Sequence, residues 1–413
     1  MNKFGSFKKY EEEWSHGEAA LESPMGRILT VTLWVLVHAM AAAAAVHPEA
    51  LAAVERIRGH AFTHPVDSVT ISRDQLPRLL HQRIEGGTYP AAADYLTALR
   101  ALELIGNPDK AVEGMIDLYA SQVMAFYDLD EHRYYAIDTP PPGLSQELAA
   151  APIMAEAIEV HELTHALQDQ RFGAGSVALR LRYDWDAQLA YQSVLEGEAT
   201  LVMLAWMGER SGLSLDQVVA NDAFVEALAG QAAALTGSSG AERYFAESLT
   251  FPYLSGLRFI AAAYRRGGWA AVDAIDRNPP ATTAEIIDPA GYAAAGSHAA
   301  APLPVSSRAL LLTHLGLFNW RFLLGDIPSG WSGDITAVFQ DARCQTSVLS
   351  ESRWTSEEAA RKFAAIYVSF LEGRGVGASS SRRGNVVRIG YGSEPSLIAS
   401  FIGYEFSLAK QAR

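Results

Sequence analysis

Apolar residues recur every three or four positions along most of the chain, and this spacing predicts a mainly helical protein. The clearest case lies between Pro152, which suits a first helical turn, and Gly173, which suits a helix end. The same spacing covers most of residues 185–320. Within that range, residues 277–291 (RNPPATTAEIIDPAG) contain too much proline for a regular element, and beyond it residues 309–324 predict a further helix.

The segments around the 152–172 helix carry other patterns. Residues 65–120 show helical spacing in SRDQLPRLLHQRI and AAADYLTALRALELIG, so we expect helices there. Residues 122–138 alternate around a turn-like DLDEH, which predicts a β-hairpin with arms at 123–127 and 134–137. Residues 172–188 (FGAGSVALRLRYDWDAQ) predict a loop or short hairpin that joins two helices.

The C-terminal part, residues 321–413, predicts a small α/β subdomain. Its expected elements are strands at 334–340 and 385–392, a helix at 355–373 and a flexible turn at 377–384 (GASSSRRG). Thr355 and Glu358 fit a capping box at the start of the helix. The fold class that follows is α+β and mainly helical, with a β-hairpin before the 152–172 helix and this subdomain at the C-terminus.

Composition narrows the range of partners. The chain has a net charge of −14 and no cluster of Lys and Arg, which argues against nucleic acid, because proteins that bind it present a basic face to the phosphates. Cys344 is the single cysteine, which excludes a disulfide framework and a cysteine-based zinc site and predicts a buried or unreactive thiol. No charged or low-complexity linker interrupts residues 60–375, so we expect one compact unit with subdomains.

The N-terminal segment predicts export. Residues 25–50 combine a basic residue, an apolar run over residues 28–46 and small residues suited to signal-peptidase cleavage. Residues 1–24 are atypical of the start of such a signal, so we interpret them as a mis-annotated extension, with translation starting at Met25. The apolar run is also long enough to remain as a membrane anchor. Residues 25–48 are thus a signal peptide or an anchor, and the protein is expected to be periplasmic or extracellular.

The sequence HELTH, residues 161–165, is the strongest chemical signal. At 3.6 residues per turn, His161 and His165 project from nearly the same side of a helix, so both imidazoles can bind one ion. Glu162 lies about 100° around the helix, close enough to contact a water on that ion. Two imidazole ligands beside a carboxylate base are what metal-assisted hydrolysis requires, and this pattern predicts Zn²⁺.

A catalytic zinc site usually takes three protein ligands, so a third ligand is needed. Glu196 lies on an otherwise apolar helical face, where an unpaired carboxylate would be costly. Glu198, about 200° around the same helix, is the competing candidate. Without the HELTH motif, either glutamate would be interpreted as a surface residue. Because HELTH precedes this helix, the apolar face favours Glu196 as the third metal ligand.

These motifs resemble those of the gluzincin metallopeptidases. HELTHA is similar to the zinc-binding helix of thermolysin, and EGEA at residues 196–199 is similar to the element in which aminopeptidase N-like enzymes place their ligand glutamate before a glycine. By this resemblance Glu196 is the ligand. The thirty residues from 166 to 195 make a longer spacing than either relative uses. The amine-binding GAMEN element of the aminopeptidases is absent, which favours an endopeptidase.

A wider resemblance, over residues 65–375, is to a largely uncharacterised group of bacterial HExxH proteins. Its matching elements are SQVMAFYDLDEHRYYAID (121–138), FPYLSG (251–256), NPPATTAEIIDP (278–289) and GWSGD (330–334). This resemblance implies a peptidase-like fold and no particular substrate.

The gluzincin resemblance also implies an oxyanion donor. In aminopeptidase N-like enzymes a Tyr-x-x-Gly sequence opens a helix beside the zinc, and Tyr253 stands three residues before Gly256. Tyr183 and Tyr191 are rivals, and a plain buried tyrosine is the alternative. By analogy with other zinc peptidases, the hairpin at 123–137 would bind a substrate backbone by strand addition, and the alternative is a purely structural hairpin.

The sequence therefore predicts an exported zinc-dependent peptidase that acts on a peptide or protein substrate. Its catalytic domain spans residues 60–320, His161, His165 and Glu196 hold the zinc, and Glu162 is the general base. The alternative is a non-catalytic cell-envelope protein in which the zinc is structural or the site vestigial.

Overall fold

The structure of the chain is a computed structural model that describes residues 46–85, 92–106, 114, 116–117, 120, 123–140, 152–220, 241–295, 309–405 and 408. The expected N-terminal extension and all but the last three residues of the expected signal peptide or anchor lie outside these residues. Among the residues that are described, no helix combines the length and the apolar character that a membrane span requires.

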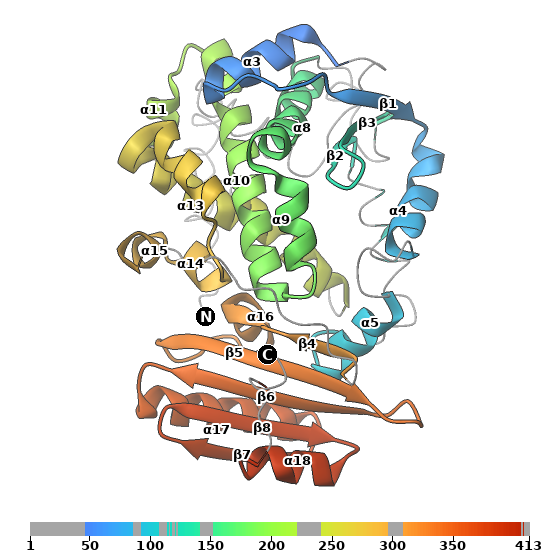
Figure 1. Cartoon of the computed structure of the whole chain (residues 1–413), viewed down its shortest axis with the longest axis vertical. Coiled ribbons are helices and arrows are strands. Elements are labelled where there is room, and N and C mark those ends of the chain that lie inside the picture. The colour runs from blue at the N-terminus through green and yellow to red at the C-terminus, as the bar shows by residue number, and fades with distance from the viewer. Residues whose placement is uncertain are drawn as a thin grey trace, which may run out of the picture.

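The protein is a mixed α+β structure in which helices predominate, as the hydrophobic pattern predicts. Figure 1 shows a helical part built around α10 and, below it, a sheet. The elements of the helical part are α3 (Pro48–Arg58), η1 (Arg73–Gln75), α4 (Leu76–Glu85), α5 (Ala92–Ala101), α8 (Pro152–Phe172), α9 (Ala174–Leu181), α10 (Trp185–Arg210), α11 (Leu215–Val219), α13 (Ala241–Arg277), α14 (Thr283–Ile287) and α15 (Pro289–Ala295).

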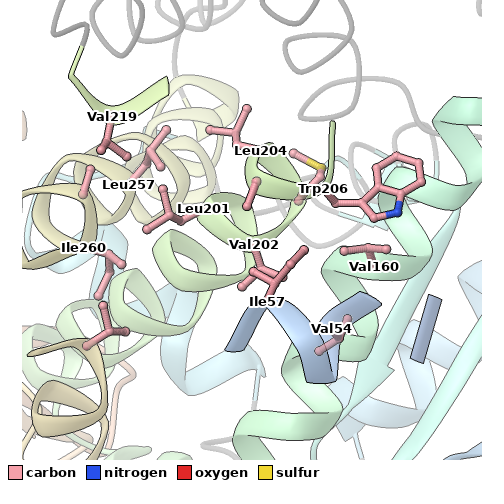
Figure 2. Close-up of a cluster of buried hydrophobic side chains, with 14 of the residues drawn as sticks. Val54, Ile57, Val160, Leu201, Val202, Leu204, Trp206, Val219, Leu257 and Ile260 are labelled. Carbon is pink, nitrogen blue, oxygen red and sulfur yellow. The ribbon is translucent and has the colours of Figure 1, made fainter. Parts of the chain in front are cut away.

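Helix α10 lies at the centre of the helical part because it is apolar on nearly all sides. Every residue from Gly197 to Gly208 is buried, which requires neighbouring helices all around it. Figure 2 shows Val54 and Ile57 of α3 beside Val202 of α10, in a cluster to which α8 and α13 also contribute. Burying each such side chain stabilises the fold by about 1.5–3 kcal/mol. The helix that carries Glu196 is therefore fixed by its surroundings.

Helices α10 and α13 cross in backbone contact at two glycines. A methyl group on Gly197 would lie 2.3 Å from the carbonyl carbon of Gly256, and one on Gly256 would lie 2.0 Å from the carbonyl oxygen of Ser193. Only glycine permits so close an approach. Further along, α13 kinks at Gly268, where φ is +60°. The crossing holds the residues one turn before Gly256 close to α10.

The hairpin expected before α8 is confirmed. Strands β2 (Ala125–Asp128) and β3 (Arg133–Ile137) pair antiparallel, and β1 (Asp67–Ile71) pairs parallel with the other side of β3. The prediction of helices throughout residues 65–120 is wrong at β1, because DSVTI carries β-branched residues that suit a strand beside β3. Since β3 is central, β2 is an edge strand, and it lies against α8.

The C-terminal sheet is antiparallel throughout, in the order β4-β5-β6-β8-β7. Its two faces are covered by different helices, because Val338 packs with α17 while Ala337 and Leu349 pack with Phe401 of α18. Cys344, in the turn between β5 and β6, is exposed. The elements are β4 (Leu311–Thr313), α16 (Gly316–Leu324), β5 (Trp331–Gln340), β6 (Thr346–Trp354), α17 (Glu357–Gly373), β7 (Ala378–Arg383), β8 (Val386–Gly392) and α18 (Pro395–Ile402).

The segment 172–188 is not the loop or hairpin that was expected, because it contains α9 and the first residues of α10. Gly173 has a φ of +70°, so α8 ends there and α9 starts directly afterwards in a new direction. Ala174 and Leu181 are buried in a cluster with Tyr191 of α10. These apolar contacts make the segment helical.

The prediction that residues 277–291 are irregular is also wrong, because their prolines stand before a helix or at its first position and not in its interior. Pro280 precedes the cap of α14, and Pro289 is the first residue of α15. The Thr282 side chain accepts the backbone N–H of Glu285, and the Glu285 carboxylate accepts the N–H of Thr282 at 3.0 Å.

Three further corrections concern the C-terminal part. The helix expected over 309–324 is instead β4 followed by α16, because residues 311–313 pair with β5. The expected turn at 377–384 contains β7, an edge strand whose serines and arginines suit an exposed sheet edge. Helix α17 is capped by Ser356 and not by Thr355, since Ser356 Oγ accepts the N–H of Ala359 at 3.1 Å.

Candidate metal centre

Helix α8 supplies three of the expected site residues, as the HELTH spacing predicts. His161 and His165 lie one turn apart, with ring centroids separated by 4.9 Å and the rings edge to face. Both histidines are buried, and Glu162 between them is partly exposed. The helix has the predicted bounds, with Pro152 at its start and Gly173 directly after its end.

Glu196 of α10 reaches the same point. Its Oε2 lies 3.1 Å from Nε2 of His161 and 3.4 Å from Nε2 of His165, and the two Nε2 atoms are 3.2 Å apart. Ligands placed about 2.0–2.1 Å from a tetrahedral zinc lie about 3.3 Å from one another. The three donor atoms therefore already have the spacing of a zinc ligand set. In the part of the chain that is described, no other group of His, Cys, Asp and Glu converges in this way.

Glu198, the competing candidate, faces away from the histidines. Its buried carboxylate accepts hydrogen bonds from the guanidinium of Arg58 on α3 and from Nε2 of Gln168, the latter at 2.6 Å. Two residues along a helix correspond to about 200°, so Glu196 and Glu198 cannot face the same ion. The structure thus brings Glu196, and not Glu198, to the two imidazoles.

The charges within the cluster depend on one another. Burial alone would lower the pKa of His165, but Glu196, with smaller effects of Glu162 and Gln168, raises that pKa to about 9. Burial would raise the pKa of Glu196, but the two imidazoles hold it well below its usual range. The Glu196 carboxylate thus requires positive charge beside it, which comes from protonated imidazoles or from a metal ion that replaces their protons.

Strand β2 positions Glu162. The backbone N–H of Tyr127 donates to Oε2 of Glu162 at 2.8 Å, so this N–H points outward from the edge of β2 and not toward β3. The phenol of Tyr127 donates to Asp169 on α8 at 3.0 Å, and His132 in the hairpin turn lies 2.5 Å from the same oxygen. Burial raises the pKa of Glu162, offset in part by His161. A carboxylate of raised pKa accepts a proton more readily, as a general base requires.

Tyr253 lies beside the first histidine. Its ring centroid is 6.0 Å from that of His161, with the ring planes 22° apart. The residue stands one turn before Gly256, so the crossing of α13 over α10 brings it to this position. It lies inside α13, however, and does not open a helix as the resemblance implies, because α13 continues through Pro252.

The two rival tyrosines have other surroundings. The ring of Tyr183 lies under the guanidinium of Arg182, at 4.7 Å from its centroid. Tyr191 is buried in the cluster between α9 and α10, and burial raises its pKa well above the usual range. Of the three tyrosines, Tyr253 is the one with a described ring contact to a site histidine.

Reasoning from the sequence missed the groups behind the histidines. Nδ1 of His165 lies 2.9 Å from Oε1 of Gln168, which stands three residues later on α8. That spacing could have indicated Gln168, since residues three apart share a helix face. No local spacing in the sequence could have indicated Arg58, because it lies on α3, far along the chain from the histidines. Nδ1 of His161 and Oγ1 of Thr200, one turn after Glu196, are buried and have no hydrogen-bond partner among the described residues.

Comparison with known proteins bears on the C-terminal sheet. A family described as a domain of unknown function (DUF8575) matches residues 318–397. These residues run from α16 to the start of α18 and contain none of the residues of the metal centre. No similar protein was found among curated proteins or among solved structures.

Proposed function

We propose that this protein is an exported, zinc-dependent peptidase of the gluzincin type. The observation that supports it most is the convergence of Nε2 of His161, Nε2 of His165 and Oε2 of Glu196 at 3.1–3.4 Å. Two imidazoles and one carboxylate are the donor set of a catalytic zinc, whereas structural zinc takes four protein ligands. Among the described residues no fourth His, Cys, Asp or Glu joins the three.

The side chains around this point suit peptide hydrolysis. A zinc ion held here would polarise the scissile carbonyl and lower the pKa of a water to about 7. Glu162 would take the proton of the attacking water and pass it to the leaving amine. The hydrogen bond from the Tyr127 backbone at 2.8 Å supports this role, because it fixes the carboxylate next to both histidines. No covalent intermediate is required.

Tyr253 would stabilise the negative charge that develops on the carbonyl oxygen. A preorganised donor at that position typically contributes about 10²- to 10³-fold to the rate. The contact between the rings of Tyr253 and His161 supports this role, because it puts the tyrosine beside one of the three converging donors. A tyrosine on α13 is held there by the glycine crossing, which suits a preorganised donor.

The substrate would be a peptide or protein, bound along β2. This strand is the edge of its sheet, and its Tyr127 N–H already donates to Glu162, so an extended segment would pair with the remaining outward groups of β2 and lie beside that carboxylate. The net charge of −14 supports a partner other than nucleic acid. The signal-like residues 25–48 support a periplasmic or extracellular location, with or without a membrane anchor at residues 28–46.

The experiment that tests the proposal is a cleavage profile. The mature protein and its Glu162→Gln variant are incubated with a proteome-derived peptide library, and new termini are mapped by mass spectrometry. We expect cleavage by the wild type, loss of cleavage in the variant, and equal zinc content in both. A wild type that holds one zinc but cleaves no more than Glu162→Gln would instead support the alternative, a non-catalytic envelope protein with a structural or vestigial zinc.

A further inference from the structure

Gln168 lies directly behind the metal centre and contacts it through one histidine. Its Oε1 is 2.9 Å from Nδ1 of His165. Its Nε2 donates to a carboxylate oxygen of Glu198 at 2.6 Å and to the carbonyl oxygen of Leu195 at 3.2 Å. Gln168, Glu198 and His165 are all buried, so water does not compete for these bonds.

The orientation of this amide is set by its neighbours. A carbonyl oxygen and a carboxylate only accept hydrogen bonds, so the NH₂ group of Gln168 must face Leu195 and Glu198. Its oxygen then faces His165 and can only accept. The carboxylate of Glu198 is held in turn by Arg58, which is fully buried and always a donor. The Glu198 carboxylate therefore accepts from Arg58 on one side and from Gln168 on the other, and Gln168 in turn accepts from His165.

We propose that Gln168 is a positioning residue that fixes the tautomer of His165. By accepting the proton on Nδ1, the amide oxygen leaves the lone pair on Nε2, the atom that faces Glu196 and His161. Glu198 and Arg58 act through Gln168 by preventing the amide from turning over. This inference rests on the proposed function, because the tautomer matters only where Nε2 binds a metal.

The chain of bonds predicts the effect of reversing one link. In Glu198→Gln, an amide that keeps its oxygen toward Arg58 presents NH₂ to the NH₂ of Gln168. Gln168 would then give up its bond to the carbonyl oxygen of Leu195, turn over and place its own NH₂ against Nδ1 of His165. That nitrogen would have to accept, so the proton would move to Nε2 and oppose metal binding. The substitution at position 198, which is linked to His165 only through Gln168, would thus weaken metal binding without altering any proposed ligand.

The matching rescue is the exchange of the two side chains. In the double variant Gln168→Glu with Glu198→Gln, a carboxylate at 168 accepts from His165 and from the new amide at 198. The oxygen of that amide accepts from Arg58, so every donor in the chain again faces an acceptor and position 168 again accepts from His165. Gln168→Met removes the acceptor with little change of shape. Gln170→Met is the control, since Gln170 lies two residues along α8 and bonds to Thr63 and His64 instead.

The test measures zinc affinity by chelator competition and the visible absorption spectrum of the cobalt(II)-loaded protein, which reports ligand geometry. We expect Gln168→Met and Glu198→Gln to lose about 10- to 100-fold in zinc affinity, the usual cost of an outer hydrogen-bond partner, and to change the cobalt spectrum. The exchanged double variant should recover both readouts. Gln170→Met should match the wild type.

Three results would overturn the inference. If the wild type binds one zinc through His161 and His165, but Gln168→Met and Glu198→Gln bind it equally well with the same cobalt spectrum, Gln168 has no positioning role and the proposed function survives. If both variants lose affinity and the folded double variant does not recover it, the effect is general damage to the core. A wild type that binds no zinc removes the proposed function and this inference together.

Discussion

Gly197 of α10 and Gly256 of α13 lie backbone against backbone, and this contact places the side chains of both helices around the candidate metal centre. Glu196 stands next to the first glycine and Tyr253 one turn before the second. The two helices could not bring these side chains to His161 if either glycine carried a methyl group, because that group would lie within 2.3 Å of backbone atoms on the other helix.

Gly256→Ala should therefore destabilise the fold and the site together. The new methyl would lie 2.0 Å from the carbonyl oxygen of Ser193, and overpacking of this kind costs about 1–3 kcal/mol. Denaturant unfolding should show that loss, and chelator competition should show weaker zinc binding. Gly373→Ala, where nothing lies within 4 Å, is the control. Equal stability of the two variants would mean that the crossing adapts.

Glu196→Gln should weaken zinc binding more than Glu198→Gln. The first change removes the negative charge of one of the three proposed ligands, whereas the second acts only through Gln168 and should cost about 10- to 100-fold. Metal analysis and chelator competition on the two purified variants measure the order. The reverse order, or equal losses, would mean that the wrong face of α10 has been assigned to the metal. His161→Ala and His165→Ala should abolish binding at ordinary concentrations.

Tyr253→Phe should leave the fold and the zinc content intact and lower kcat by about 10²- to 10³-fold, the usual cost of removing an oxyanion donor of the kind proposed for Tyr253. The ring contact with His161 is kept, since phenylalanine has the same ring. Tyr183→Phe is the matched control, because that ring contacts Arg182 instead. Near-wild-type kcat in Tyr253→Phe, measured on a substrate found by cleavage profiling, would remove this residue from the mechanism.

Asp186→Asn should change how stability depends on pH. Burial raises the pKa of Asp186 to about 8, and its carboxyl accepts both the N–H and the hydroxyl of Thr283. The folded state keeps this proton over a range in which the unfolded chain, with a pKa near 3.8, has lost it. The stabilisation of the folded state by the protonated Asp186 carboxyl is therefore complete below about pH 4 and is lost as the pH rises toward 8.

An asparagine at position 186 keeps an oxygen for Thr283 and has no proton to lose. The melting temperature of Asp186→Asn relative to wild type should thus rise between about pH 5 and pH 8 and then stay level. His314 has a pKa of about 9, because burial would lower this pKa but the hydrogen bond and charge of Asp184 raise it by more. It would produce a separate decline of stability in both proteins from about pH 6.5 to 9. A difference that does not vary with pH would show that Asp186 is ionised in the folded protein.

A chain that begins at Met25 should be exported and cut before His47. The backbone N–H of His47 donates to the buried Glu159 at 2.7 Å, and α3 begins at Pro48, so a cut beyond this point would remove part of the core. N-terminal sequencing of the exported protein gives the cleavage site. Recovery of Met1 or Met25 in the membrane fraction would show an uncleaved anchor instead.

The features that could be predicted from the sequence are those that a single element determines. His161, Glu162 and His165 share one helix, so its geometry alone places them, and the alternation of residues 122–138 is enough to predict the hairpin. The position of Glu196, and not Glu198, beside the two histidines could also be predicted, because the two glutamates point to different sides of α10, and the role of Glu196 as a metal ligand stays a prediction. The catalytic roles of these residues stay predictions.

What could not be predicted depends on partners far along the chain. Arg58 and Glu198 are 140 residues apart, so no local pattern joins them. Strands β1 and β4 are short, and each exists because it pairs with a later strand. Segment 172–188 was misjudged because α9 depends on burial against α10, which a reading of its own residues does not reveal.

Strand β4 also limits how the C-terminal sheet can be separated from the rest of the protein. The family match starts at residue 318, beyond β4, so a fragment cut there would leave β5 as an unpaired edge able to associate with other chains. A cut before residue 309 would instead deprive α10 of two anchors, since the backbone N–H of Trp185 donates to Oγ1 of Thr313 at 2.8 Å and that of Asp186 donates to the carbonyl oxygen of His314 at 3.1 Å. A soluble fragment that contains the sheet should therefore start near residue 309, so that β4 is included. Removing that fragment from the protein should loosen the first turn of α10, the helix that carries Glu196.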